Sequence, residues 1–110
     1  MSATYQDFLS FEIRVGKVLT ADPFPEARRP AYKLSIDFGP LGIKQSSAQI
    51  TERYAVKDLV GRHVIAVTNF PPKRVAGFSS EVLVLGAVPE KGGVVLVRPD
   101  TEVEPGSRIL

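Results

Sequence analysis

Short segments of alternating apolar and polar residues, separated by Gly and Pro, constrain the fold of this chain most. Phe11, Ile13 and Val15 alternate with charged residues, and alternation resumes over residues 32–38 after a segment that holds three prolines. A two-residue period is typical of a β-strand with one buried face. We therefore predict a fold built mainly of strands.

Gly16 interrupts the first of these segments, which we predict to be one long strand over residues 11–21. A glycine inside a strand is typical of a bulge or a sharp bend. A small barrel needs such a bend because its first strand passes from one sheet into another. We therefore predict a long strand that bends at Gly16.

Further segments rich in apolar and β-branched residues are predicted to be strands at 43–47, 63–70, 81–85 and 94–97. The only helical stretch is expected over residues 49–61, with Thr51 or Ser47 as its N-cap and Gly61 at its end. About six strands with a helical insert between the third and fourth match an all-β, five-stranded Greek-key barrel of the OB type with an extra strand. A β-sandwich with a small helix is the alternative.

Chain length and composition limit the classes of protein. One domain over residues 1–110 is expected, because two domains would each be too short to bury a core. No apolar run reaches the roughly 20 residues of a membrane-spanning helix, and the N-terminus lacks the features of an export signal. The absence of Cys is compatible with a reducing compartment. We expect a cytoplasmic protein without membrane insertion.

The two ends of the chain are more apolar than termini usually are. Tyr5 and Phe8 lie in an N-terminal extension at 1–10, and a C-terminal extension at 87–110 contains a run of apolar residues. Termini fray unless something covers them, and two-fold pairing is the commonest way to bury a shared patch. We predict that both extensions form a homodimer interface.

The residues needed for enzyme chemistry are largely missing. With one His and no Cys, no zinc site of ordinary ligand spacing can form, and a catalytic triad would have to use His63. That residue lies in an apolar segment, where a packed or surface role is expected. No glycine-rich phosphate motif occurs. We expect no catalytic residue, no metal and no cofactor, and hence a non-enzymatic binding protein.

The segment 69–77 points most directly to binding. Phe70 precedes two prolines and the adjacent cations Lys73 and Arg74. The prolines stiffen a loop after a strand, and bases of single-stranded RNA stack on aromatic rings while Lys and Arg hold the phosphates. The loop would suit an unpaired RNA segment. The alternative is a rigid surface connection with solvated charges.

Four more cations are expected in or beside the second and third strands: Arg28, Arg29, Lys33 and Lys44. OB folds bind oligonucleotides on this sheet surface. By strand alternation Lys33 points away from the core residues Leu34 and Ile36. A binding face and a solvated outer face both remain open, and the net charge of +2 permits RNA binding without requiring it.

A polar run over residues 45–49 opens the helical insert. Ser46, Ser47 and Gln49 would either hydrogen-bond a ligand backbone or cap the insert, and both remain open. Apolar peptide capture is another use of the same surface, since exposed apolar residues mark partner sites. The candidates in expected loops are Phe24, Phe70, Val75 and Phe78. Their alternative role is to plug the ends of the barrel.

Several motifs in fixed order resemble the tRNA-binding domain appended to methionyl- and phenylalanyl-tRNA synthetases, an OB fold. They are Phe11–Val18, Phe24–Arg28, Tyr32–Gly39 and Asn69–Ser80. The closer resemblance is to the stand-alone CsaA-type branch of this family. It is carried by Pro25–Arg28, Lys44–Thr51, Asn69–Pro72 and Ser80–Gly86.

This resemblance implies a homodimeric, export-related chaperone that binds unfolded or presecretory polypeptides, with tRNA binding as the alternative function. The positions matching the tRNA-binding motif are Asn69, Pro72, Arg74, Gly77 and Ser80. Ala76 stands where the synthetase appendices usually have a basic residue, and Ala48-Gln49 where they have Ser-Gly. Losing a phosphate contact weakens RNA binding, so peptide binding is favoured. The expected peptide- or RNA-binding residues are Arg28, Arg29, Lys33, Lys44, Ser46, Ser47, Gln49, Asn69, Phe70, Lys73, Arg74, Phe78 and Ser80.

Overall fold

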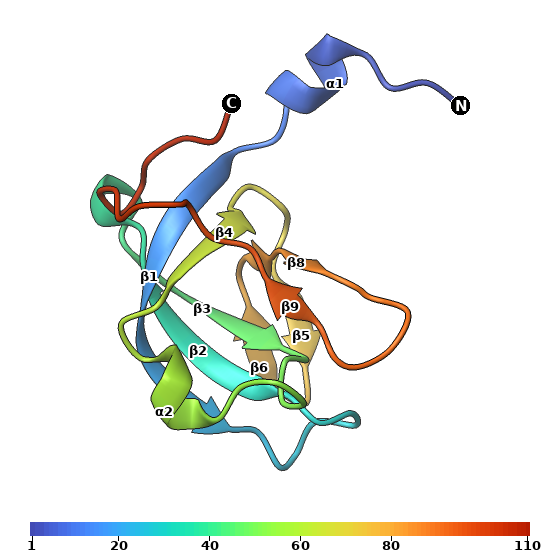
Figure 1. Ribbon diagram of the computed structural model, residues 1–110, viewed down its shortest axis with the longest axis vertical. Helices are drawn as coiled ribbons and strands as arrows, with labels where there is room; N and C mark the ends of the chain where they lie inside the picture. Colours follow the sequence, from blue (N-terminus) through green and yellow to red (C-terminus); the bar gives the residue numbers. More distant parts are fainter.

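A computed structural model describes all 110 residues and has the mostly β fold that the sequence predicts. Five strands form one antiparallel sheet in the order β3-β2-β1-β4-β7, which curls into a nearly closed barrel (Figure 1). These strands are β1 (Ile13–Pro23), β2 (Tyr32–Asp37), β3 (Ile43–Ala48), β4 (His63–Val67) and β7 (Leu83–Val84). The predicted five-stranded barrel of the OB type is confirmed.

Four short strands form two hairpin-like pairs outside this sheet. They are β5 (Lys73–Val75) with β6 (Phe78–Ser80), and β8 (Gly86–Ala87) with β9 (Val95–Leu96). The helical elements are α1 (Tyr5–Leu9), the 3₁₀ turn η1 (Gly39–Leu41) and α2 (Val56–Leu59). The helix α1 was not predicted; a capping box between Thr4 and Asp7 supports it.

The helical insert lies between β3 and β4 as predicted, but α2 is much shorter than the expected stretch 49–61. Tertiary hydrogen bonds hold the residues before it in a non-helical path. Tyr32 Oη donates to the Tyr54 carbonyl at 2.7 Å, and Arg53 Nε donates to the Gly93 carbonyl at 2.8 Å. These contacts with distant segments override the local helical tendency.

Strand β1 is long, as predicted, and pairs first with β4 and then with β2. A bulge does not occur at Gly16, because the register shift falls between Val18 and Thr20. The expected bend at Gly16 stays a prediction, and the strand changes its pairing partner next to it, at Lys17. Gly16 is needed for a different reason. A Cβ there would lie 2.5 Å from Ile36 Cγ2 and 2.7 Å from Phe38 Cε1. The glycine therefore allows core side chains to pack directly on the strand.

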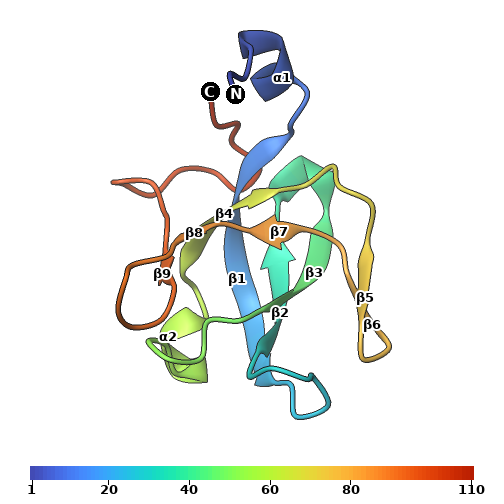
Figure 2. The ribbon, with the colours of Figure 1, turned by 90° about the vertical axis from the view of Figure 1, so that its right-hand side faces the viewer.

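Strand alternation places the apolar faces inside the barrel. The largest fully buried apolar side chains are Phe38, Leu34, Ile36, Leu59, Val15, Val18 and Val64. Each such burial contributes about 1.5–3 kcal/mol relative to exposure. Leu59 comes from α2, which covers the end of the barrel opposite α1 (Figure 2).

Hydrogen bonds between β3 and the segment before β7 complete the barrel. The Glu81 N–H donates to the Gln45 carbonyl at 2.8 Å, and the Gln45 N–H donates to Glu81 Oε1 at 2.9 Å. The Ser46 hydroxyl donates to the Val82 carbonyl at 3.1 Å. The side chain of Glu81 thus satisfies the Gln45 N–H, a backbone group of β3 that a neighbouring strand would otherwise pair.

The C-terminal segment pairs with the beginning of β1. The Gly106 N–H donates to Val15 O at 2.7 Å, the Val15 N–H donates to Ser107 O at 2.9 Å, and the Ile109 N–H donates to Ile13 O at 2.9 Å. Both this segment and α1 lie at the same end of the molecule (Figures 1 and 2).

Candidate binding groove

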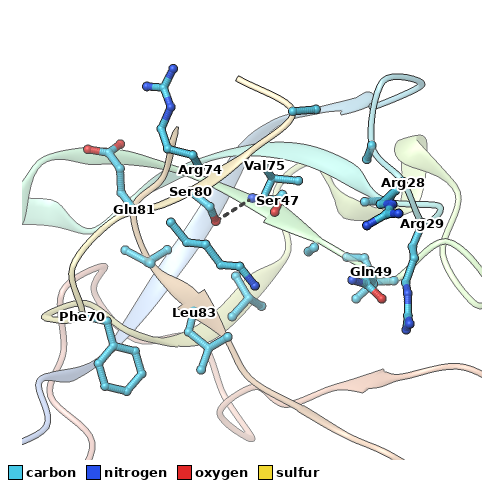
Figure 3. A pocket seen from close by; sticks show the side chains of 18 of the residues that line it. Arg28, Arg29, Ser47, Gln49, Phe70, Arg74, Val75, Ser80, Glu81 and Leu83 are labelled. Carbon is cyan, nitrogen blue, oxygen red and sulfur yellow. Dashed lines mark hydrogen bonds between the residues drawn. The ribbon is translucent and has the colours of Figure 1, made fainter. Parts of the chain in front are cut away.

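A groove of about 950 Å³ runs along one side of the barrel (Figure 3). The β1–β2 loop, residues 24–31, forms one wall, and the β5–β6 hairpin forms another. The end of β3 and the strand β7 supply further lining residues. Of the 21 residues that line the groove, 11 are hydrophobic, so the groove offers an apolar surface as well as a polar one.

The groove brings together eight residues that the sequence predicts for binding. They are Arg28, Arg29, Ser47, Gln49, Phe70, Lys73, Arg74 and Ser80. Figure 3 shows Arg28, Arg29 and Gln49 toward one end, and Phe70 and Leu83 toward the other. We call the end with Arg28 and Arg29 the basic end and the end with Phe70 the apolar end, and Arg74 and Glu81 also lie on the Phe70 side.

The other predicted residues lie outside the groove lining: Lys33, Lys44, Ser46, Asn69 and Phe78. Ser46 is fully buried, and its hydroxyl is bonded within the barrel. Asn69 holds the N-terminal segment: its Nδ2 donates to Ser10 O at 2.8 Å, and its Oδ1 accepts from the Glu12 N–H at 2.9 Å. Lys44 pairs with Ile36 across β3 and β2.

Lys33 and two phenylalanines form a contact that we call the aromatic clamp. Lys33 Nζ lies 4.7 Å from the ring centroid of Phe24 and 5.4 Å from that of Phe78. The two rings meet edge to face, with centroids 5.5 Å apart. Phe24 comes from the β1–β2 loop and Phe78 from β6, so the clamp joins the two walls of the groove.

Hydrogen bonds to β3 fix the hairpin. Gln45 Nε2 donates to the Ser79 carbonyl at 2.9 Å, and the Ser47 N–H donates to the Ser80 hydroxyl at 3.0 Å (Figure 3). Its turn has positive φ at both central residues, +46° at Ala76 and +82° at Gly77, as in a type I′ turn.

The expected rigid loop over residues 70–74 is wrong for Lys73 and Arg74, which lie in β5. The strands of this hairpin are too short for alternation to stand out, and Ala-Gly is not a common sequence for a type I′ turn. Pairing with β6 places successive side chains on opposite faces of the hairpin.

Four cations of the groove have no partner within the chain. Arg28, Arg29, Lys73 and Arg74 are all exposed, and none forms an ion pair. The ion pair of Arg14 with Glu12 and the contact of His63 Nδ1 with Glu102 Oε1 at 4.0 Å both lie elsewhere. The groove cations are thus free to pair with an anionic ligand.

Sequence reasoning missed several apolar residues of the groove. Leu83 is 50% exposed and lies between Val82, which is buried, and Val84. Residues 82–85 are all apolar, so the sequence does not indicate which of these side chains is exposed. Strand alternation does place Leu83 on the face of the strand opposite to that of the buried Val82. Ile50 and Val94 also line the groove, but only the folded chain brings them there.

The structure has neither a metal-ligand cluster nor a helix that could span a membrane. No group of three or more His, Cys, Asp or Glu side chains is placed to hold a metal ion. No helix has the length and hydropathy needed to cross a membrane. His63 is half-buried and does not line the groove.

Solved structures of similar chains match this fold over its whole length. The chaperone CsaA from Bacillus anthracis strain Ames is 58% identical, with a TM-score of 0.95 and full coverage of both chains. The CsaA chaperone protein from Picrophilus torridus is 51% identical, with a TM-score of 0.93, and the match covers 99% of this chain and 100% of that one.

A family model described as a putative tRNA binding domain matches residues 13–108. The methionine–tRNA ligase of Porphyromonas gingivalis is 36% identical over 105 residues, which is 96% of this chain. The match spans about 15% of the length of that ligase. Together with the match over full length to the solved chaperones, this shows that the chain belongs to the putative tRNA-binding domain family, in its CsaA-type branch.

Proposed function

We propose that this chain is a non-enzymatic, export-related chaperone of the cytoplasm that holds unfolded or presecretory polypeptides in the groove. The observation that carries this proposal is the exposure of large apolar side chains inside the groove. Phe70 is 40% exposed and Leu83 is 50% exposed. Exposed apolar patches mark partner sites, and unfolded chains offer the apolar side chains that would cover them.

The proposed chaperone acts as a homodimer through the extensions at 1–10 and 87–110. Large apolar side chains of both extensions face solvent in the single chain: Tyr5 is 70% exposed, Val88 81% and Leu110 86%. A second copy that covers them would bury apolar area, which favours association.

An aggregation assay tests the chaperone function. The full chain is expected to slow the aggregation of a chemically unfolded presecretory protein. A double variant, Phe70→Ser with Leu83→Ser, should bind the unfolded client about tenfold more weakly, because losing about 1.4 kcal/mol of apolar contact corresponds to that factor. Leu41→Ser with Val60→Ser is the control, since these residues are 40% and 54% exposed and lie outside the groove. Equal activity of both double variants would refute the proposal.

Binding of tRNA by the same face is a second candidate. The four unpaired cations of the groove and the family membership favour it. Counterion release makes such binding weaken steeply with added salt. A titration with bulk tRNA at low and moderate salt tests it, and an absent or salt-independent signal would exclude this function.

A further inference from the structure

We propose that the groove selects polypeptide segments in which an apolar anchor lies close to acidic side chains. This inference rests on the proposed chaperone function and adds the chemistry of the preferred client segment. It follows from three features of the groove: its unpaired cations, its smaller number of carboxylates, and the kind of apolar surface at its other end.

The cations are the first feature. Arg28 and Arg29 lie together toward one end of the groove on the β1–β2 loop (Figure 3). Lys73 and Arg74 lie on the hairpin wall, where the Arg74 side chain points away from Arg28 and Arg29. No carboxylate of the chain is within ion-pair distance of any of them. A ligand carboxylate near Arg28 and Arg29 would be attracted by both guanidinium groups, whereas a basic ligand there would be repelled.

The acidic residues of the groove do not cancel this charge. Only Glu26 and Glu81 are acidic among the lining residues. Glu81 Oε1 accepts a hydrogen bond from the Gln45 N–H at 2.9 Å, so this carboxylate is committed to closing the barrel. Four cations against two carboxylates leave the groove with an excess of positive charge.

The apolar end distinguishes a polypeptide from a nucleic acid. Base stacking needs exposed aromatic rings along the path of the strand. Phe70 is the only aromatic residue that lines the groove, and its ring already packs edge to face on Phe11, with centroids 5.8 Å apart. The remaining large apolar residues of the lining are aliphatic, among them Leu83, Val84 and Val94. Aliphatic surface suits a Leu, Ile, Val or Phe side chain of a peptide better than a row of bases.

Four labelled peptides of equal length test the selectivity by fluorescence anisotropy. One carries an apolar cluster beside two Asp residues, the second replaces these with Asn, and the third with Lys. The fourth keeps the Asp residues but replaces the apolar cluster with Ala. The full wild-type chain should bind the apolar-acidic peptide about tenfold more tightly than the apolar-basic one at low salt, since each exposed charge contact changes the affinity by a few-fold. The apolar-neutral peptide should fall between them, and the Ala peptide should bind weakest or not at all.

Two double variants test whether Arg28 and Arg29 cause the preference for acidic peptides. Arg28→Gln with Arg29→Gln should reduce the difference between acidic and basic peptides to about twofold while leaving binding of the neutral peptide unchanged. Lys17→Gln with Lys57→Gln is the control, because both lysines are exposed and outside the groove. It removes the same charge and should keep the full preference.

The outcomes separate the two proposals. If none of the apolar peptides binds, the proposed chaperone function fails. If the neutral peptide binds but the acidic and basic peptides bind equally, the selectivity fails and the function stands. A single-stranded RNA of similar length that binds more tightly than the apolar-acidic peptide would also overturn the selectivity, because the groove cations would then serve phosphates.

Discussion

Lys33 shows how a single residue can have the predicted orientation and a different role. Alternation along β2 correctly placed its side chain on the face opposite Leu34 and Ile36. Its ammonium group, however, lies over the rings of Phe24 and Phe78 instead of lining the groove. Alternation along a strand predicts which face of the strand a side chain occupies. It does not predict that Phe24 of the β1–β2 loop and Phe78 of β6 would lie beside Lys33.

Replacing Lys33 is expected to loosen both walls of the groove. Lys33→Met keeps the length of the side chain but removes the charge, so it should lose about 1 kcal/mol of folding stability from the cation–π contacts. Lys33→Arg keeps a cation over the rings and should remain close to wild type. Urea unfolding measures the stability, and hydrogen exchange in β5 and β6 reports on the hairpin. Identical behaviour of the Met and Arg variants would show that the charge has no role in the clamp.

Glu12 gives the molecule a defined acid sensitivity. A hydrogen bond from Arg14, 2.7 Å from Glu12 Oε1, lowers the pKa of the Glu12 carboxyl below its ordinary value of 4.5. Because the folded-state pKa is depressed, the stabilisation is present above about pH 4.5 and is lost as the pH falls through the lower folded pKa.

Glu12→Gln should therefore be less stable than wild type at pH 7, and the difference should shrink progressively below pH 4.5. Thermal unfolding of the two proteins at a series of pH values measures this. A difference that stays constant, or grows, toward acid pH would contradict the role of the charged pair.

Among the elements, the strands of the barrel were predicted from local sequence patterns. The β5–β6 hairpin was not, because it depends on pairing with distant segments. The strands at 32–37 and 63–67 lie within the predicted segments because their alternation or β-branched content is continuous. The β5–β6 hairpin was missed because three-residue strands carry no clear period. The groove depends on this hairpin, so eight of its 21 lining residues were predicted as binding residues, but their arrangement around one groove was not.

The turn of this hairpin offers a stability test. Ala76 has φ +46°, a region that costs an L-residue about 1 kcal/mol or more and that Asn tolerates better. Ala76→Asn should raise the stability of the hairpin by up to about 1 kcal/mol, and Ala76→Val should lower it by a similar amount. Hydrogen exchange of the β5 and β6 amides, compared with β2 amides as an internal reference, measures the effect. A stabilising Val or a destabilising Asn would be inconsistent with this turn geometry.

In the whole molecule, the barrel encloses the hydrophobic core but leaves apolar side chains of the two extensions exposed. Helix α1 has no buried residue, although the C-terminal segment is hydrogen-bonded to β1. A single chain therefore leaves apolar side chains of both extensions in solvent, which is the basis of the proposed homodimer. Sequence composition could predict the surplus of apolar residues, but not which of them the barrel itself would cover, such as Leu96.

Sedimentation velocity at micromolar concentration is expected to show a particle of twice the chain mass of 12.0 kDa. Tyr5→Asp with Val88→Asp should shift the protein toward the monomer, because a charge in an apolar interface is costly. Val60→Asp, at a site 54% exposed outside both extensions, should remain dimeric. A wild-type protein that stays at 12.0 kDa would exclude the dimer.

We propose that unfolded polypeptide binds in the groove between the β1–β2 loop and the β5–β6 hairpin. Backbone NMR spectra of the full chain, titrated with an unfolded presecretory segment, test it most directly. The expected chemical-shift changes concentrate in residues 26–31, 47–50 and 70–84, with little change in α2. Shifts confined to other surfaces, or no shifts at saturating peptide, would show that unfolded polypeptide does not bind in the groove.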